Sequence, residues 1–251
     1  MSQIIFDIET GPLREDQIAV MMPPLEAEAP PEKLPPFDPA AVKLGNTKDP
    51  AKIQEKILDA KGKHEAAWKA AREKYAAAAA EHEAKFRERA ALSPLTGQVL
   101  AIGYRTDQGD TIHGASEQEL LVQFWNVFMS SAKNKRRMIG HNIFGFDLPF
   151  LIRQTWRHGM PVPESVQTKG RYWHEVFVDT MDVWRCGNYR DSFVSLNDLA
   201  KFFGVGGKPE GVDGGDFARL WLNESTKPQA IEYLKNDLEM TYRVAVAMGI
   251  S

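Results

Sequence analysis

Residues 50–92 form a long run of Ala, Glu, Lys and Arg, which are among the strongest helix formers. Asp49 suits a helix N-cap, and Pro50 suits the first helical turn. As one helix this run would be about 64 Å long, whereas a body made from the other regular segments would be only roughly 40 Å across. The helix must therefore overhang, break or find a partner surface. We expect a helical insertion over residues 49–92, with a break near Gly62.

The same run carries a narrow apolar stripe, spaced at the three or four residues that place side chains on one face of a helix. The stripe is formed by Ile53, Ile57, Ala60, His64, Trp68, Ala71, Tyr75, Ala78, His82 and Phe86. It can pack onto its own domain, dock a partner such as a polymerase, or guide a nucleic-acid strand. Ahead of it, residues 14–48 form a proline-rich connection, within which residues 22–38 are expected to be extended.

The remaining residues, 1–13 and 93–251, alternate between strand and helix patterns and are expected to form a single domain. Apolar β-rich runs start the chain and return after the insertion, and amphipathic helical runs follow them. Expected strands cover residues 1–6, 98–104, 111–113 and 137–140, and expected helices cover 117–131, 146–158, 196–203, 217–222 and 228–248. This order predicts an α/β fold with a mixed sheet.

Composition excludes several classes of protein. The single cysteine, Cys186, excludes an internal disulfide framework and a cysteine-based zinc site. No charged-then-apolar leader and no apolar run of about 20 residues is visible, so we expect a cytoplasmic protein without a membrane anchor. The net charge of −3 and the pI near 6.1 do not indicate a nucleic-acid partner. Residues 130–190, however, hold ten Lys or Arg against five Asp or Glu.

Two acids stand close together in the first apolar run, FDIET, at Asp7 and Glu9. Residues two apart in a strand point to the same face. At about 4 Å and an effective dielectric near 20, two such charges repel by roughly 4 kcal/mol. A bound cation, a basic partner or protonation would offset this repulsion. The structural alternative is that one acid faces solvent and the other caps a turn.

Two further acidic clusters follow along the chain. In GHNIFGFDLPFL, Asp147 begins an apolar helix, where the helix dipole by itself favours a carboxylate. In YLKNDLEMTY, Tyr233 and Asp237 lie four residues apart and so share one helix face. Taken singly, each cluster has an ordinary structural explanation.

Together, these three clusters resemble the exonuclease motifs of the DEDD (DnaQ-like) 3′→5′ exonuclease superfamily. The Tyr–Asp spacing is that of its tyrosine branch, because the histidine of the other branch is absent from positions 232 and 233. The chain is most similar to predicted stand-alone exonucleases related to the proofreading exonuclease domain of family B DNA polymerases. The resemblance covers residues 1–13 and about 95–248, and leaves the insertion unexplained.

The resemblance implies a ribonuclease H-like fold, a mixed sheet flanked by helices, with roles for particular residues. Asp7, Glu9, Asp147 and Asp237 match the four carboxylates that hold two Mg²⁺ or Mn²⁺ ions. Tyr233 matches the tyrosine that positions the attacking water. Thr10, Asn142 and Phe146 match residues that contact the 3′-terminal nucleotide.

The implied activity is metal-dependent 3′→5′ hydrolysis of single-stranded DNA, in which two cations roughly 3.5–4 Å apart activate water and stabilise the leaving oxygen. An RNA-directed exonuclease would share every catalytic residue. A catalytically inactive nucleic-acid-binding or polymerase-associated module is the other alternative. DNA, and with it a role in replication or repair, is favoured only by the likeness to proofreading domains.

Other candidates are weaker. His141 reads as a structural histidine, and Asp179 and Asp182 follow a β-like run near the expected site. The glycine-rich stretch 204–209 lacks the Ser or Thr of a phosphate-binding loop, because Pro209 takes that position. Candidate nucleic-acid contacts in the basic region include Lys133, Arg153, Arg157, Lys169, Arg171, Arg185 and Arg190, and candidate stacking rings are Phe144, Phe146, Tyr172, Trp173 and Trp184.

Overall fold

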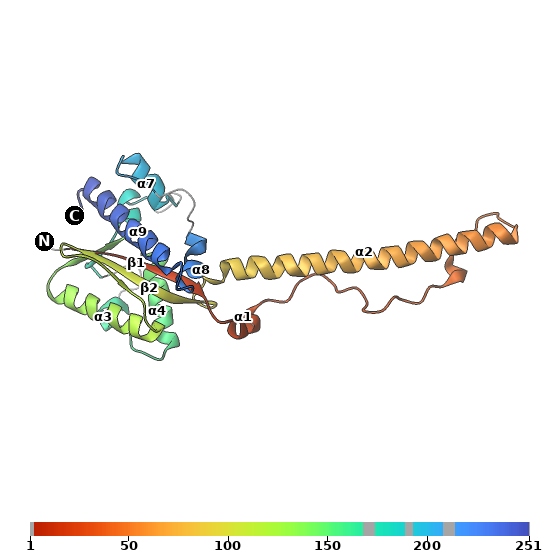
Figure 1. Cartoon of the computed structure of the whole chain (residues 1–251), viewed down its shortest axis with the longest axis horizontal. Helices are drawn as coiled ribbons and strands as arrows, with labels where there is room; N and C mark the ends of the chain where they lie inside the picture. Colours follow the sequence, from red (N-terminus) through yellow and green to blue (C-terminus); the bar gives the residue numbers. More distant parts are fainter. Residues whose placement is uncertain (1–2, 168–173, 189–192, 208–213, 251) are drawn as a thin grey trace. The chain divides into compact units, whose positions relative to one another are not determined.

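The computed structural model describes residues 3–167, 174–188, 193–207 and 214–250. It divides into two compact units, one made of residues 1–20 with 89–251 and the other of residues 21–88. We call the first the body and the second the insertion unit, and describe each by itself (Figure 1). Of the weaker candidates, Lys169, Arg171, Tyr172, Trp173 and Arg190 lie outside the described residues.

The body is built on a mixed five-stranded sheet (Figure 1). Its strands are β1 (Gln3–Pro12), β2 (Gly97–Thr106), β3 (Gly109–His113), β4 (Arg137–Gly140) and β5 (Phe177–Asp179), in the order β3-β2-β1-β4-β5. The pairs β1–β2 and β2–β3 are antiparallel, whereas β1–β4 and β4–β5 are parallel. The first strand along the chain is therefore the central strand of the sheet.

Helices cover both faces of this sheet (Figure 1). One face packs on α3 (Glu117–Lys133) and α4 (Asp147–Arg157), and the other on α8 (Phe217–Trp221) and α9 (Lys227–Ala247). Helix α7 (Leu196–Phe202) packs on α9. The shorter elements are α1 (Glu15–Met21), α5 (Glu164–Gln167), α6 (Thr180–Trp184), η1 (Pro39–Ala41) and η2 (Gly214–Asp216). The expected mixed sheet flanked by helices is confirmed.

Strand β1 sends alternate side chains to opposite layers, as a strand period of two requires. Ile4, Phe6 and Ile8 are buried in the core that faces α3 and α4. Ile5 points the other way and packs against Leu238 of α9. The next side chains on that second face are Asp7 and Glu9, so the strand delivers both acids to the α9 side of the sheet.

Helix α9 lies close against the sheet because β2 has a glycine where the two meet. A Cβ on Gly103 would lie 2.9 Å from Leu238 Cδ1 and 3.0 Å from Leu234 Cγ. Both leucines are fully buried. A larger residue at position 103 would push the helix away from β1 and from the acids that β1 carries.

Helix α2 (Pro50–Ala90), which belongs to the insertion unit up to Glu88, is continuous over 41 residues. The expected break near Gly62 was wrong. One glycine costs a helix only about 1 kcal/mol, and the flanking residues are good helix formers. An ion pair between Lys63 and Asp59, 2.7 Å long, also spans this turn. The full-length helix therefore persists through position 62.

The proline-rich connection contacts the apolar stripe of α2 at several residues. His64 Nε2 and Trp68 Nε1 donate to the carbonyls of Pro35 and Pro31, at 2.9 and 3.0 Å. His82 Nε2 donates to Pro23 O at 2.9 Å. Because a carbonyl only accepts, Nε2 is the donor in both histidine bonds. The partner surface of the stripe is thus a neighbouring segment of the same chain.

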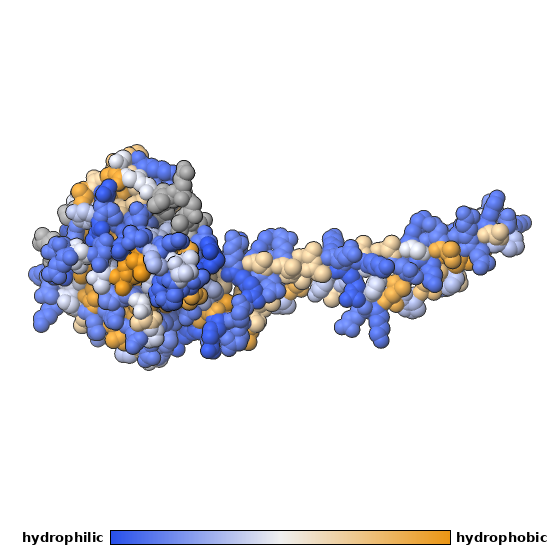
Figure 2. Space-filling model, in the orientation of Figure 1, coloured by the Kyte–Doolittle hydropathy of each residue, from blue (hydrophilic) through white to orange (hydrophobic). Residues whose placement is uncertain are grey.

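The surface of α2 that remains visible is mostly charged or small. Figure 2 shows hydrophilic residues alternating with pale, weakly apolar ones along this helix. Among the described residues, no helix is both long and apolar enough to cross a membrane.

Candidate active site

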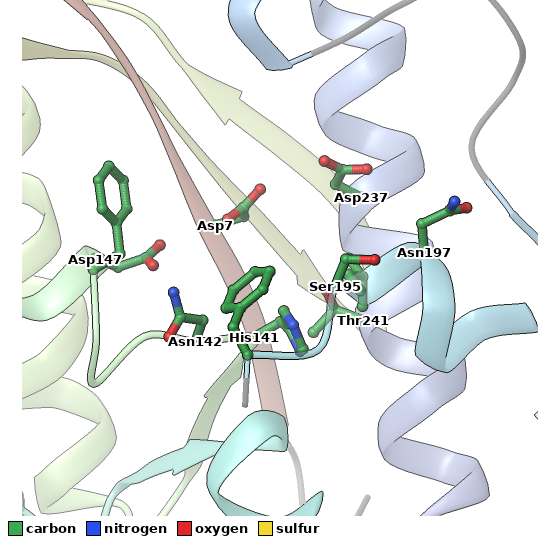
Figure 3. Close-up of a pocket in the computed structure, with 11 residues that line it drawn as sticks. Asp7, His141, Asn142, Asp147, Ser195, Asn197, Asp237 and Thr241 are labelled. Carbon is green, nitrogen blue, oxygen red and sulfur yellow. The ribbon is translucent and has the colours of Figure 1, made fainter. Parts of the chain in front are cut away.

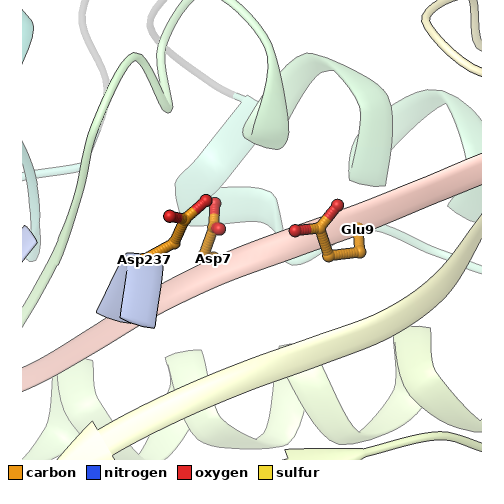
Figure 4. A group of neighbouring side chains, drawn as sticks. All are labelled: Asp7, Glu9 and Asp237. Carbon is orange, nitrogen blue, oxygen red and sulfur yellow. The ribbon is translucent and has the colours of Figure 1, made fainter. Parts of the chain in front are cut away.

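Three carboxylates meet where β1 faces α9. One ligand oxygen from each of Asp7, Glu9 and Asp237 lies within 4.8 Å of the others (Figure 4). Asp7 and Glu9 are half-buried and Asp237 is buried. The pairing of β1 with β2 shifts register between Glu9 and Thr10, and such bulges redirect side chains at functional sites. The strand period and this bulge together set the direction of the Glu9 carboxylate.

Tyr233 stands one helical turn before Asp237 on α9 and is only 8% exposed. Burial raises the pKa of its hydroxyl, and the negative charges of Asp237, Glu9 and Asp7 raise that pKa further. The hydroxyl also forms a hydrogen bond with Asp237. Tyr233 is therefore a neutral hydrogen-bond donor beside all three carboxylates.

Asp147, the first residue of α4, is 3% exposed. Its Oδ1 accepts a hydrogen bond of 3.3 Å from the backbone N–H of Ile8. Burial raises the pKa of this carboxyl well above the usual 3.8, and the charge of Asp7 raises it further. Asp147 lies beside the group of three carboxylates and is electrostatically linked to it through Asp7.

A cleft of about 390 Å³ brings these groups together. Asp7, Asp147 and Asp237 line it, as do Asn142 and Phe146 (Figure 3). Figure 3 shows the carboxylates of Asp7, Asp147 and Asp237, which come from β1, α4 and α9, pointing into the cleft. Five of the eight residues that the resemblance singles out therefore line the cleft. Two more, Glu9 and Tyr233, interact with the carboxylates that line it.

Thr10 is the one of these eight residues that neither lines the described cleft nor interacts with the carboxylates that do. It is half-buried and follows Glu9 after the bulge, where the register with β2 changes. The described cleft is lined by residues from β1, α4, α7, α9 and two loops, and neither Glu9 nor Thr10 is among them. A role for Thr10 at the terminal nucleotide stays a prediction.

The loop between β4 and α4 carries Asn142 in a left-handed conformation, with φ 59°. Asp179 fixes this loop, because its carboxylate accepts backbone hydrogen bonds from Asn142 and Phe144, at 2.8 and 2.9 Å. It also accepts one from Met181 at 2.9 Å. Burial raises the pKa of Asp179, and these three hydrogen bonds oppose the rise. Asp179, a weak candidate from sequence, is thus a buried anchor of the loop.

Sequence reasoning missed several residues of the cleft. These are Phe193, Ser195, Leu196, Asn197 and Thr241, and His141 joins them although it was expected to be structural. Both ring nitrogens of His141 are hydrogen-bonded, to Thr180 Oγ1 and to Val194 O, each at 2.9 Å. Ser195 carries a local signal as the N-cap of α7. Thr241 carries another, because it lies four residues after Asp237 on α9 and so shares its helix face. The others reach the cleft through tertiary folding alone.

The carboxylates in and beside the cleft fit a hard divalent cation. Asp7, Glu9 and Asp237 offer only carboxylate oxygens, which Mg²⁺ and Mn²⁺ prefer over nitrogen or sulfur ligands. Without a cation, three or four negative charges in one place repel each other. The raised pKa of Asp147 reflects that repulsion together with burial. A bound cation would offset both effects.

Comparison with protein-family models matches residues 98–249 to a family described as a predicted 3′–5′ exonuclease related to the exonuclease domain of PolB. Among solved structures, the chain is similar to the family B DNA polymerase from the hyperthermophilic archaeon Pyrobaculum calidifontis, with 19% identity and a TM-score of 0.51. The match covers 63% of this chain but only 22% of the polymerase, and it confirms the ribonuclease H-like fold. No curated protein matches the chain.

Proposed function

Because the chain belongs to the family of predicted 3′→5′ exonucleases related to the exonuclease domain of PolB, we propose that it removes nucleotides from the 3′ end of single-stranded DNA, using two Mg²⁺ or Mn²⁺ ions. One observation carries the proposal: Asp7, Glu9 and Asp237 place ligand oxygens within 4.8 Å of one another. Asp147 lines the same cleft as Asp7 and Asp237. An acidic cleft of this kind accepts a phosphodiester only when cations are present.

Asp7, Glu9, Asp147 and Asp237 would hold the ions. When bound, the cations would supply Lewis-acid activation of a water molecule and neutralise charge on the phosphate. Asp147 is held in place for this task by its hydrogen bond from Ile8 N–H. Asp237 is fixed by the packing of α9 on the sheet through Leu234 and Leu238.

Tyr233 orients the attacking water in this proposal. Its hydroxyl stays protonated at neutral pH because burial and three carboxylates raise its pKa. A neutral hydroxyl donates one hydrogen bond and accepts another. Tyr233 can therefore donate to Asp237 and accept a hydrogen bond from water, without acting as a base itself.

Asn142 and Phe146 contact the terminal nucleotide in this proposal, with Thr10 close to its sugar or base. Phe146 packs against Phe150 with ring centroids 5.5 Å apart, so its position is set by the α4 core. The support for DNA over RNA is the likeness to a polymerase exonuclease domain. Docking of a polymerase on the insertion unit belongs to the same proposal, as does a function in replication or repair.

The test is degradation of oligonucleotides labelled at the 3′ or the 5′ end, with DNA and RNA in parallel and with Mg²⁺, Mn²⁺ or EDTA. We expect stepwise shortening of DNA from the 3′ end that requires the cation, and loss of this activity in Asp147→Ala. Preferential shortening of RNA would favour the RNA-directed alternative. Binding without any shortening would indicate a catalytically inactive module.

A further inference from the structure

One large aromatic side chain of the cleft has no part in the roles assigned above. Phe193 lines the cleft together with Asp7, Asp147 and Asp237. Its surface is 63% exposed, so it contributes little to the core of the body. Exposed phenylalanines occur singly on many proteins, but this one stands beside the candidate catalytic carboxylates.

His141 holds the segment that carries Phe193. Because Val194 O only accepts, His141 Nε2 donates to it at 2.9 Å, and Nδ1 forms a hydrogen bond with Thr180 Oγ1 at the same distance. Thr180 is fully buried at the start of α6. The backbone next to Phe193 is therefore tied to the rigid end of β5 rather than only to neighbouring loop residues.

The Phe193 ring also touches His141 directly. The two ring centroids lie 6.4 Å apart, and the planes meet at 70°. Rings in this edge-to-face arrangement do not cover each other as stacked rings do. His141 can therefore occupy at most one face of Phe193, and the other face can receive a flat partner.

The surroundings decide what kind of flat partner fits. The cleft is lined by carboxylates, which disfavour an uncomplexed anion but not an uncharged ring. Nucleobases are flat and uncharged, and they stack on aromatic side chains in proteins that bind single strands. The charged phosphates of the same strand would lie with the cations at Asp7, Glu9 and Asp237.

We propose that Phe193 forms a nucleobase subsite of the cleft, in which its ring stacks on a base at or next to the 3′ end of the strand. This inference rests on the proposed function and specifies how the strand is gripped. Stacking is tolerant of base identity, because every base has a π-face. The subsite therefore favours unpaired ends without imposing a sequence.

The test compares Phe193→Ala with Phe193→Tyr, which keeps a ring, and with the control Phe202→Ala. Phe202 is 69% exposed and packs edge-on against Trp184 and Phe203 at the far end of α7, away from the residues that line the described cleft. Two substrates are used with Mn²⁺: a single-stranded oligonucleotide and the p-nitrophenyl ester of thymidine 5′-monophosphate, which has one base. Fluorescence anisotropy with Ca²⁺ measures binding of the labelled oligonucleotide in parallel.

We expect Phe193→Ala to raise KM and Kd for the oligonucleotide about tenfold with little change in kcat, as loss of one stacked base would. Phe193→Tyr and Phe202→Ala should stay within twofold of the parent. A matching rise in KM for the nitrophenyl ester places the terminal base on Phe193, and an unchanged KM places the next base there.

Equal KM and Kd for Phe193→Ala and Phe202→Ala would overturn the subsite while leaving the exonuclease proposal intact. A parent protein that degrades neither substrate would overturn the exonuclease proposal. The binding measurement with Ca²⁺ does not need turnover. It therefore still measures how much Phe193 contributes to oligonucleotide affinity, even if the parent protein degrades neither substrate.

Discussion

Asp147 Oδ1 accepts a hydrogen bond of 3.3 Å from the backbone N–H of Ile8, which lies 139 positions earlier in the chain. Ile8 stands between Asp7 and Glu9 on β1. The parallel pairing of β1 with β4 ends at Ile5, which leaves this N–H to a side chain of α4. The backbone between two of the acids thus anchors a third.

Replacing Asp147 by asparagine should stabilise the metal-free protein while abolishing activity. The substitution keeps an oxygen for the Ile8 N–H but removes a charge that burial and Asp7 both oppose. We expect Tm without divalent cations at pH 7 to rise by at least about 2 °C. Differential scanning calorimetry in EDTA checks this, and a lower Tm would contradict the electrostatic interpretation.

The raised pKa of Asp147 predicts that the stability of the metal-free protein depends on pH. The pKa of Asp147 is raised in the folded protein above the usual 3.8, so the folded state binds this proton more tightly than the unfolded state. Its contribution to stability is therefore present at low pH and is lost as pH rises from about 3.8 through the folded pKa. The free energy of unfolding is measured with urea in EDTA across this pH window. We expect it to decrease less with rising pH in Asp147→Asn than in the parent protein. Equal slopes would be inconsistent with the raised pKa.

Tyr233→Phe should slow hydrolysis by about 10- to 100-fold without changing the affinity for Mn²⁺. The phenyl ring preserves the packing against Phe217, whose ring centroid lies 6.3 Å away, and only the hydroxyl is lost. Single-turnover rates together with calorimetric Mn²⁺ titration separate the two effects. A parental rate would mean that Tyr233 only packs.

Asp179→Ala should cost about 3 kcal/mol of stability, because three backbone N–H groups lose their acceptor. Asp182→Ala, on the half-buried position three residues later, is the matched control and should change the free energy of unfolding by less than about 0.5 kcal/mol. Urea denaturation of both variants provides the comparison. Similar losses in the two would argue against the role of Asp179 as an anchor.

Gly145→Ala should disturb Asn142 selectively. A Cβ at position 145 would lie 2.4 Å from Asn142 Oδ1, so the amide must move. We expect KM for an oligonucleotide to rise several-fold, to about the level of Asn142→Ala, and the double variant to show no additional loss. Additive effects of the two substitutions would show that position 145 acts through something other than Asn142.

Gly62→Ala tests the continuity of α2. A Cβ at position 62 meets no atom within 4 Å, and alanine favours a helix over glycine by about 1 kcal/mol. We expect slower amide hydrogen exchange in residues around position 62 and unchanged nuclease activity. Faster exchange after the substitution would indicate that the chain is not helical at that point.

Local periodicity let the sequence predict most of the fold of the body. The strand period predicts that Asp7 and Glu9 share a face, and the helix period predicts that Tyr233 lies above Asp237. Both relationships are present. They depend on backbone geometry within a few residues, which is why a single sequence suffices to predict them.

Most of the errors and omissions concern contacts between segments distant in the chain. The length of a helix over residues 50–92, compared with the width of the body, predicts a break at Gly62, but α2 is continuous and the proline-rich connection supplies a partner surface. Phe193 reaches the cleft without any nearby motif, whereas Thr241 lies within the YLKNDLEMTY cluster, four residues after Asp237. The sequence shows Asp179 only as an acid that follows a β-like run. Its role as an anchor depends on three backbone hydrogen bonds that exist only in the folded protein.

The sequence by itself therefore determined which side chains can carry the chemistry, since a periodic backbone fixes the face each one takes. Only the tertiary structure decided how closely the acids approach, which loop Asp179 holds, and that Asp147 bonds to Ile8 N–H. These outcomes depend on packing, such as that of α9 over Gly103, and packing energy is summed over residues that no local pattern connects.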